Sequence, residues 1–227
     1  LKATQAYDYL LIKGTPGTVH TSYALVAMVK EALSESSSIL LSAYTNRAVD
    51  EICDKMDKHK IQYIRIGSEL SCDERFRKNL LDEKIRLNPN ADIVRKVIQE
   101  TRVFVGTITS ISGKLNLFGI KHFDLAIIDE ASQILEPNLL GILCARHKNQ
   151  TAIDKFIFIG DHKQLPAVVQ QSERESIVSE PELIKIGMSD WRNSLFERLI
   201  NIQKKNGSEE FIHMLFKQGR MHPEISS

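Results

Sequence analysis

Two segments of the sequence decide its fold: Phe123-Asp124-Leu125-Ala126-Ile127-Ile128-Asp129-Glu130-Ala131-Ser132-Gln133 and Phe156-Ile157-Phe158-Ile159-Gly160-Asp161-His162-Lys163-Gln164-Leu165-Pro166. Each is an apolar run that ends at carboxylates. A short run that is apolar on both faces is typical of a strand in a parallel sheet covered by helices on both sides. The ligand of such a sheet binds beyond the carboxyl ends of its strands. We therefore expect Asp129, Glu130 and Asp161 to line one crevice.

The composition is that of a soluble globular protein, since 42% of the 227 residues are hydrophobic and 26% are charged. Lysine and arginine number 30 against 29 for aspartate and glutamate. The chain as a whole therefore has no electrostatic attraction to nucleic acid, and any such binding must come from local patches.

Cysteine usage and hydropathy favour an intracellular location. Cys53, Cys72 and Cys144 are odd in number and share no ligand spacing, which argues against a disulfide framework, a zinc site or an iron-sulfur site. No apolar run approaches the roughly 20 residues that span a bilayer, and the N-terminus has no signal-peptide pattern. We expect a cytoplasmic protein with no membrane partner, or a nuclear one if the source is eukaryotic.

Strands and helices alternate along the rest of the chain. Asp8–Lys13 is strand-like, and a glycine-bearing turn joins it to an amphipathic helix over Ser22–Leu33. The pattern then predicts a strand over Ile39–Tyr44, a helix over Ala48–His59, a short apolar run over Ile61–Ile66, a strand over Val103–Ser110, a helix from about Pro137 to Arg146, an amphipathic segment over Trp191–Ile202 and an apolar run over Phe211–Phe216. This order predicts a three-layer α/β domain with a mostly parallel sheet.

The segment from Ser68 to Arg102 departs from this pattern because it is dense in charge. Its apolar residues keep helical spacing on either side of Asn88-Pro89-Asn90. We interpret residues 68–101 as a helical insertion standing on the sheet domain; the alternative is a solvated helical pair with no ligand.

The turn after the first strand partly matches a phosphate-binding loop of the form Gly-x4-Gly-Lys-Ser/Thr. Such a loop holds anionic oxygens with backbone amides, a lysine and a hydroxyl that serves Mg2+. Gly14 and Thr21 fit this register, but Val19 replaces the second glycine and His20 replaces the lysine. A β-branched residue crowds the cradle, and a largely neutral histidine loses a charge-assisted contact. The loop alone is also consistent with an ordinary turn.

The carboxylates supply a stronger signal. Asp129 can hold Mg2+ through its water shell, and Glu130 can orient or deprotonate an attacking water. Gln164, at the end of an adjacent predicted strand, can sense the γ-phosphate or that water. Acidic pairs after strands also occur as plain loop caps, and a single glutamine there is more often structural.

Six stretches resemble, in order, the motifs of superfamily 1 helicases of the group that contains the nonsense-decay RNA helicase and the replication helicase-nuclease. They are Gly14-Thr15-Pro16-Gly17-Thr18-Val19-His20-Thr21, Ala43-Tyr44-Thr45-Asn46-Arg47-Ala48-Val49-Asp50, Val105-Gly106-Thr107-Ile108-Thr109, Ile128-Asp129-Glu130-Ala131-Ser132-Gln133, Gly160-Asp161-His162-Lys163-Gln164-Leu165-Pro166 and Gln218-Gly219-Arg220-Met221-His222-Pro223-Glu224-Ile225. The second and fourth look closer to the replication helicase-nuclease branch. Together the six cover nearly the whole chain.

The resemblance implies a RecA-like P-loop NTPase fold. Residues 1–67 and 102–216 would form the first motor domain, 68–101 the helical insertion, and 217–227 the start of a truncated second motor domain. That second motor domain of the same full-length chain would be a partner, and Gly219 replaces the tyrosine usual before Arg220.

The resemblance also implies site residues. ATP would be held by Gly14, Thr15, Pro16, Gly17, Thr18, His20 and Thr21, with Gln5 resembling the adenine-reading glutamine although only eight residues separate it from Gly14. Thr21 and Asp129 would serve Mg2+. Glu130, Gln164 and Arg220 would be catalytic, with Glu130 as the base and Arg220 directed at the transferring phosphate.

The single strand would be bound by Tyr44, Thr45, Asn46, Thr107 and Thr109, which the resemblance assigns to the opposite rim of the sheet. Hydroxyl and amide donors suit phosphates, and an aromatic ring can stack on a base, although Tyr44 could equally be a core residue.

The resulting hypothesis is the first motor domain of a DNA helicase that couples ATP hydrolysis to translocation on single-stranded DNA, with weak or no activity in this chain alone. Two alternatives stay open: a degenerate domain that only binds nucleic acid or protein, and an RNA helicase. The sequence does not indicate an oligomeric state.

Overall fold

A parallel sheet forms the centre of the molecule. The computed structural model describes residues 8–14, 20–88, 90–161, 169, 172–207 and 211–215, without the side chains of residues 20–22 and 214–215. Within these residues, seven parallel strands are ordered β3-β4-β2-β5-β8-β1-β9. They are β1 Tyr9–Gly14, β2 Ile39–Ala43, β3 Ile64–Ile66, β4 Val103–Thr107, β5 Phe123–Ile128, β8 Ile153–Gly160 and β9 Ile212–Leu215. The predicted parallel sheet is confirmed.

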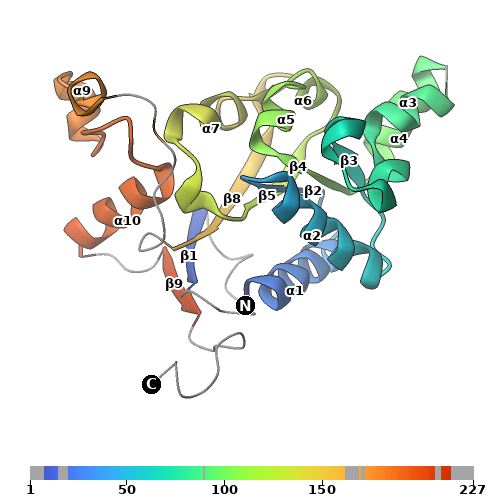
Figure 1. The fold of residues 1–227 in the computed structure, drawn as a ribbon, viewed down its shortest axis with the longest axis horizontal. Helices are drawn as coiled ribbons and strands as arrows, with labels where there is room; N and C mark the ends of the chain where they lie inside the picture. The colour runs from blue at the N-terminus through green and yellow to red at the C-terminus, as the bar shows by residue number, and fades with distance from the viewer. Residues whose placement is uncertain are drawn as a thin grey trace.

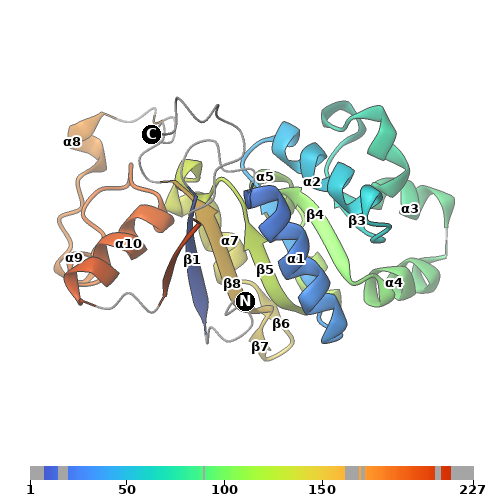
Figure 2. The same ribbon diagram turned by 90° about the horizontal axis from the view of Figure 1, so that it is seen from below.

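Helices cover both faces of this sheet (Figure 1). On one face lie α1 His20–Ser34 and α2 Asn46–Lys58, which Figure 2 shows in front of the strands. On the other lie α5 Ile108–Ser112, α6 Leu117–Ile120 and α7 Glu136–Leu143. Short helices α8 Glu173–Ser176 and α9 Pro181–Lys185, with α10 Leu195–Lys205, stand at the end of the molecule near β1 and β9. The predicted three-layer α/β domain is therefore confirmed.

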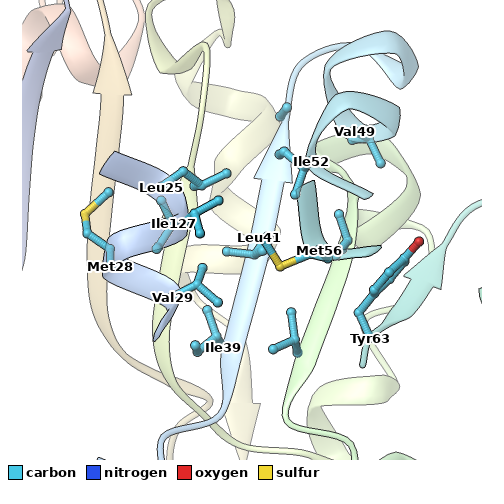
Figure 3. Packing of buried hydrophobic residues seen from close by; sticks show 14 of the residues in the cluster. Leu25, Met28, Val29, Ile39, Leu41, Val49, Ile52, Met56, Tyr63 and Ile127 are labelled. Carbon is cyan, nitrogen blue, oxygen red and sulfur yellow. The ribbon is translucent and has the colours of Figure 1, made fainter. Parts of the chain in front are cut away.

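The strands are apolar throughout because alternate side chains enter two different cores. Ile39 and Leu41 pack with α1 and α2, whereas Leu40 belongs to the cluster on the opposite face. Figure 3 shows the first core, in which Leu25 of α1 and Met56 of α2 meet the sheet. Full burial of such a side chain contributes about 1.5 to 3 kcal/mol. The helices on both faces are therefore needed for the stability of the sheet.

Several predicted boundaries were wrong for local reasons. The helix expected to reach Arg146 ends at Leu143, after which β6 Arg146–His147 and β7 Gln150–Thr151 form a small antiparallel hairpin. The strand expected to reach Ser110 ends at Thr107, whose Oγ1 accepts a hydrogen bond from the Ser110 amide and so begins α5. Such a side-chain cap satisfies a helix N-terminal amide and favours helix over strand.

The charged segment after β3 is helical, with η2 Glu69–Ser71, η3 Glu74–Asn79, α3 Leu81–Leu87 and α4 Ala91–Glu100. It does not merely stand in solvent, because Phe76 packs into the first core and Ile98 into the second. Lys121 Nζ, 7% exposed, donates to the Gln99 carbonyl at 2.6 Å and ties α4 to the main sheet. The domain division at residues 68 and 101 stays a prediction.

A buried ion pair fastens α7 to α10. The Arg198 guanidinium forms two hydrogen bonds with the Glu136 carboxylate, and its remaining nitrogen donates to the Ile186 carbonyl at 2.7 Å. The two side chains are only 13% and 7% exposed. This geometry holds α10 against the carboxyl-end segment after β5. None of the described helices is long and apolar enough to cross a bilayer.

Candidate functional site

Asp129 and Glu130 lie at the carboxyl end of β5, beside β2. The Asp129 amide donates to the Ser42 carbonyl at 2.8 Å, which continues the pairing of these strands by one residue. The Glu130 amide donates to Asp129 Oδ1 at 2.9 Å. Strand pairing therefore fixes the position of the first carboxylate, which in turn orients the backbone of the second.

Glu130 is held in the left-handed backbone region, with φ 54° and ψ 30°. A non-glycine residue there costs on the order of 1 to 3 kcal/mol, and such conformations cluster at functional sites. Its Oε2 is buried and, within the described residues, accepts no hydrogen bond. A buried carboxylate oxygen without a donor, on a residue with a strained backbone, is suited to accept a proton or face a cation.

Burial raises the pKa of both carboxyl groups above the ordinary range. For Asp129 the Glu130 amide and the charge of Lys55 act against this effect, whereas Glu51 adds to it. For Glu130 the Asp129 charge raises the pKa further, and the Thr45 backbone and hydroxyl lower it. Two like charges that share a desolvated position favour a cation between them.

The raised pKa values make stability fall as pH rises. Between the ordinary carboxyl pKa, about 4, and the raised folded value, the folded protein binds more protons than the unfolded chain, so unfolding becomes easier. We expect Glu130→Gln to raise the melting temperature at pH 7 and to lose this advantage near pH 4, measured by thermal unfolding across that range. Glu83→Gln is the control, because Arg86 lowers the Glu83 pKa and its removal should give no gain.

The end of β8 lies against the segment that follows Glu130. The Asp161 amide donates to Ser132 Oγ at 3.3 Å, and Asp161 is 8% exposed. A Cβ on Gly160 would lie 2.9 Å from the Ser132 amide nitrogen, so this close approach requires glycine. The structure thus brings Asp129, Glu130 and Asp161 to the carboxyl ends of the paired strands β5 and β8, as the sequence predicts.

Substituting Gly160 should therefore be costly. We expect Gly160→Ala to destabilise the chain by about 1 to 3 kcal/mol, because the backbone of Ser132 must move. Gly119→Ala is the matched control, since nothing lies within 4 Å of its added Cβ in the helix α6. Alanine is the better helix former, so the control should be neutral or stabilising. Equal losses for both variants in urea unfolding would refute the packing argument.

The two ends of the predicted phosphate loop lie at this same edge. β1 ends at Gly14, next to β8, where Lys13 pairs with Gly160. α1 begins at His20 and has no acidic residue in its first turn. The N-terminus of a helix favours anions through its free amides and its dipole. The strand and the helix that the sequence predicts on either side of the loop are both present, and residues 15–19 lie outside the described residues.

Seven proposed site residues lie outside the described residues: Gln5, Thr15, Pro16, Gly17, Thr18, Gln164 and Arg220. The backbone of His20 and Thr21 is described, but their side chains are not. Their assigned roles stay predictions.

The proposed nucleic-acid residues follow β2 and β4. Ala43 and Thr107 are paired at the ends of these strands. Because β2 is also parallel to β5, Tyr44 and Thr109 emerge at the same edge as Asp129. The expected opposite rim was wrong, since parallel strands share one carboxyl edge; the two groups are separated along that edge, on neighbouring strands.

The exposure of these residues differs. Tyr44 is 38% exposed, which excludes the core alternative, and Asn46 and Thr109 are exposed. Thr45 is exposed too, but its Oγ1 accepts from the Ala48 amide at 3.1 Å and caps α2. Thr107 is buried, and its hydroxyl is engaged with Ser110. Thr107 therefore positions α5 rather than offering a donor to a ligand.

Sequence reasoning missed Arg65, a buried residue that links α2 to the segment after β3. It is 1% exposed on β3, pairs with Asp50 of α2 and donates to the Ser71 carbonyl at 3.2 Å. It also lies 3.7 Å from Cys53 Sγ, and burial raises the pKa of that thiol to about 11. A charged residue inside the apolar run Ile61–Ile66 was the available signal.

Carboxylates that could hold a cation occur at both ends of the sheet. Asp129 and Glu130 fit Mg2+ because they are neighbouring oxygen donors and because Glu130 Oε2 is buried without a hydrogen-bond donor among the described residues. At the amino edge, ligand atoms of His122, Asp124 and Asp154 lie within 4.8 Å of one another. His122 and Asp154 already pair at 2.9 Å, and Asp124 accepts from the Ser38 amide, which accounts for that cluster without an ion.

A family model described as an AAA domain matches residues 1–92 and 73–172. The chain is 36% identical over 173 residues to the DNA replication ATP-dependent helicase/nuclease JHS1 of Arabidopsis thaliana, covering 76% of this chain and 12% of that protein. It is 31% identical over 227 residues to the DNA replication ATP-dependent helicase/nuclease DNA2 of Homo sapiens, covering 100% of this chain and 19% of that protein. The chain therefore spans a fifth or less of these relatives.

Solved structures give a weaker likeness. Bacteroides Pif1 bound to single-stranded DNA has a TM-score of 0.45 and 17% identity, covering 98% of this chain and 41% of that one. A structure described as two coordinating Pif1 helicases unwinding forked double-stranded DNA has a TM-score of 0.48 and 14% identity, covering 99% of this chain and 44% of that one.

Proposed function

The chain belongs to the AAA domain family, as a superfamily 1 helicase domain closer to the DNA2 helicase/nucleases, and on that premise we propose that it is the first motor domain of an ATP-dependent DNA helicase. The observation that carries the proposal is the strained, desolvated pair Asp129 and Glu130 at the carboxyl edge of the sheet. In the full-length protein this edge would couple ATP hydrolysis to translocation on single-stranded DNA, with the second motor domain as its partner. A nuclear or cytoplasmic location goes with this proposal.

Within the proposed site, each residue has one task. Asp129, with Thr21, would hold Mg2+, which neutralises charge on the transferring phosphate when bound. Glu130 accepts the proton of the attacking water at its free Oε2, a step favoured by an elevated pKa. Gln164 and Arg220 would complete the site from the segments after β8 and β9.

Nucleic acid would cross the same edge at the neighbouring strands. Exposed Tyr44, Asn46 and Thr109 provide an aromatic face and polar donors there. Thr45 connects the nucleic-acid residues with the carboxylates. It caps α2, and its amide and hydroxyl lower the pKa of Glu130. Binding of a strand next to Thr45 can therefore change the environment of the Glu130 carboxylate.

The altered loop gives the proposal its test. We expect the full-length protein to hydrolyse ATP slowly with single-stranded DNA, and Val19→Gly with His20→Lys to increase turnover by an order of magnitude or more, because a lysine contact to phosphate is restored. Equal rates would contradict the account of the loop, and no hydrolysis by either protein would favour the degenerate binding module. Competition between single-stranded DNA and RNA separates the DNA motor from the RNA helicase.

A further inference from the structure

Leu70 is a solvent-exposed aliphatic residue in the short helical turn η2. It is 99% exposed, the highest value among the exposed large hydrophobic residues of the described chain. It lies in η2, three residues after Gly67, the residue that follows β3. Single exposed leucines are common on protein surfaces, so exposure alone assigns no role. The surroundings of Leu70 decide the question.

The turn that carries Leu70 is fastened on both sides. The buried Arg65 donates to the Ser71 carbonyl at 3.2 Å, and the Ser68 and Ser71 hydroxyls lie 2.9 Å apart. Glu69 forms an ion pair with Arg77 at 3.4 Å. Each neighbour of Leu70 is therefore tied to the protein, whereas its own side chain is left in solvent.

The turn also lies on the edge that carries the proposed nucleic-acid surface. β3 is parallel to β4, and Ile66 pairs with Gly106 just before both strands end. A Cβ on Gly67 would lie 3.8 Å from Ser110 Oγ, so the turn adjoins the start of α5. Along this edge the chain thus presents Tyr44 after β2, Thr109 after β4 and Leu70 after β3.

We propose that Leu70 is a nucleic-acid contact that packs against a base of the single strand and extends the nucleic-acid surface to the end of β3. Aliphatic side chains such as leucine can pack against exposed base steps without reading sequence. The Ser110 hydroxyl accepts from Thr107 at 2.9 Å, so its own hydrogen can be donated to an adjoining phosphate. This inference rests on the proposed function, because it requires a strand on this edge.

The test measures the affinity of the full-length protein for a fluorescent oligothymidylate by anisotropy. Leu70→Ala should weaken binding about five- to tenfold. Leu70→Met should bind with native affinity, since an apolar surface of similar size is sufficient. An apolar contact releases no counterions, so the slope of log affinity against log salt should stay unchanged in Leu70→Ala. Ile177→Ala, which removes a 59% exposed residue beside α8, is the control and should bind normally.

Three outcomes overturn the inference in distinguishable ways. If Leu70→Ala binds with native affinity while Tyr44→Ala binds more weakly, Leu70 is excluded as a contact and the proposed function stands. A flatter salt slope in Leu70→Ala shows that phosphate contacts were lost instead. Absence of strand binding by the unmodified protein overturns both this inference and the proposed function.

Discussion

Replacing Glu130 with glutamine in the full-length protein should lower the rate of ATP hydrolysis by about 10²- to 10⁴-fold, the range that a positioned general base contributes. Glutamine keeps the size of the side chain but cannot accept the proton. The left-handed backbone, the buried Oε2 without a donor and the raised pKa all concern this one carboxylate. Steady-state phosphate release with saturating single-stranded DNA measures the effect.

Glu51→Gln is the matched control for this prediction. Glu51 lies on α2, and its charge acts on both Asp129 and Glu130, but its ion pair with Arg47 is exposed to solvent. We expect its turnover to stay within a few-fold of native. A Glu130→Gln protein that hydrolyses ATP as fast as Glu51→Gln would exclude Glu130 as the base. Nucleotide affinity should survive in both variants.

Replacing Arg65 with methionine should cost the chain about 3 to 5 kcal/mol of folding free energy, the usual result when one partner of a buried ion pair is removed. The guanidinium is 1% exposed, and it links Asp50 of α2 to the Ser71 carbonyl of η2. Methionine fills much of the volume but removes the hydrogen bonds to both acceptors. Urea unfolding of the purified chain gives the free energy.

Arg75→Met separates the loss of a buried contact from the loss of a charge. Arg75 also pairs with aspartates, at 3.1 Å to Asp73 and 3.5 Å to Asp54, but its side chain is 65% exposed. Exposed pairs contribute about 1 kcal/mol or less. Similar losses in the two variants would contradict the structural role assigned to Arg65. A smaller loss in Arg75→Met, together with weakened strand binding in Arg65→Met, would support it.

The fold could be predicted because the strands are apolar on both faces. Runs such as Phe123–Ile128 are specified by two cores, and carboxylates mark where β5 and β8 end. The boundaries that failed depend on single hydrogen bonds. Thr107 reads equally as the end of a strand or the cap of a helix, and only the contact with the Ser110 amide decides it.

The site was predictable in its residue types and less so in its arrangement. Asp129 and Glu130 were found as carboxylates after an apolar run, but the left-handed conformation of Glu130 has no sequence signal. Arg65 and Leu70 belong to no motif. One is a charge that folding buries, and the other is an apolar side chain that folding leaves exposed. The burial of Arg65 depends on its contacts with Asp50 of α2 and with Ser71 of η2, which no sequence pattern specifies.

The coupling of ATP hydrolysis to a single strand is tested most directly by one measurement: phosphate release by the full-length protein carrying Val19→Gly and His20→Lys, with and without single-stranded DNA. We expect the strand to stimulate hydrolysis and the added Glu130→Gln substitution to abolish the stimulated rate. Hydrolysis that is unaffected by the strand, or that persists with Glu130→Gln, would contradict this coupling.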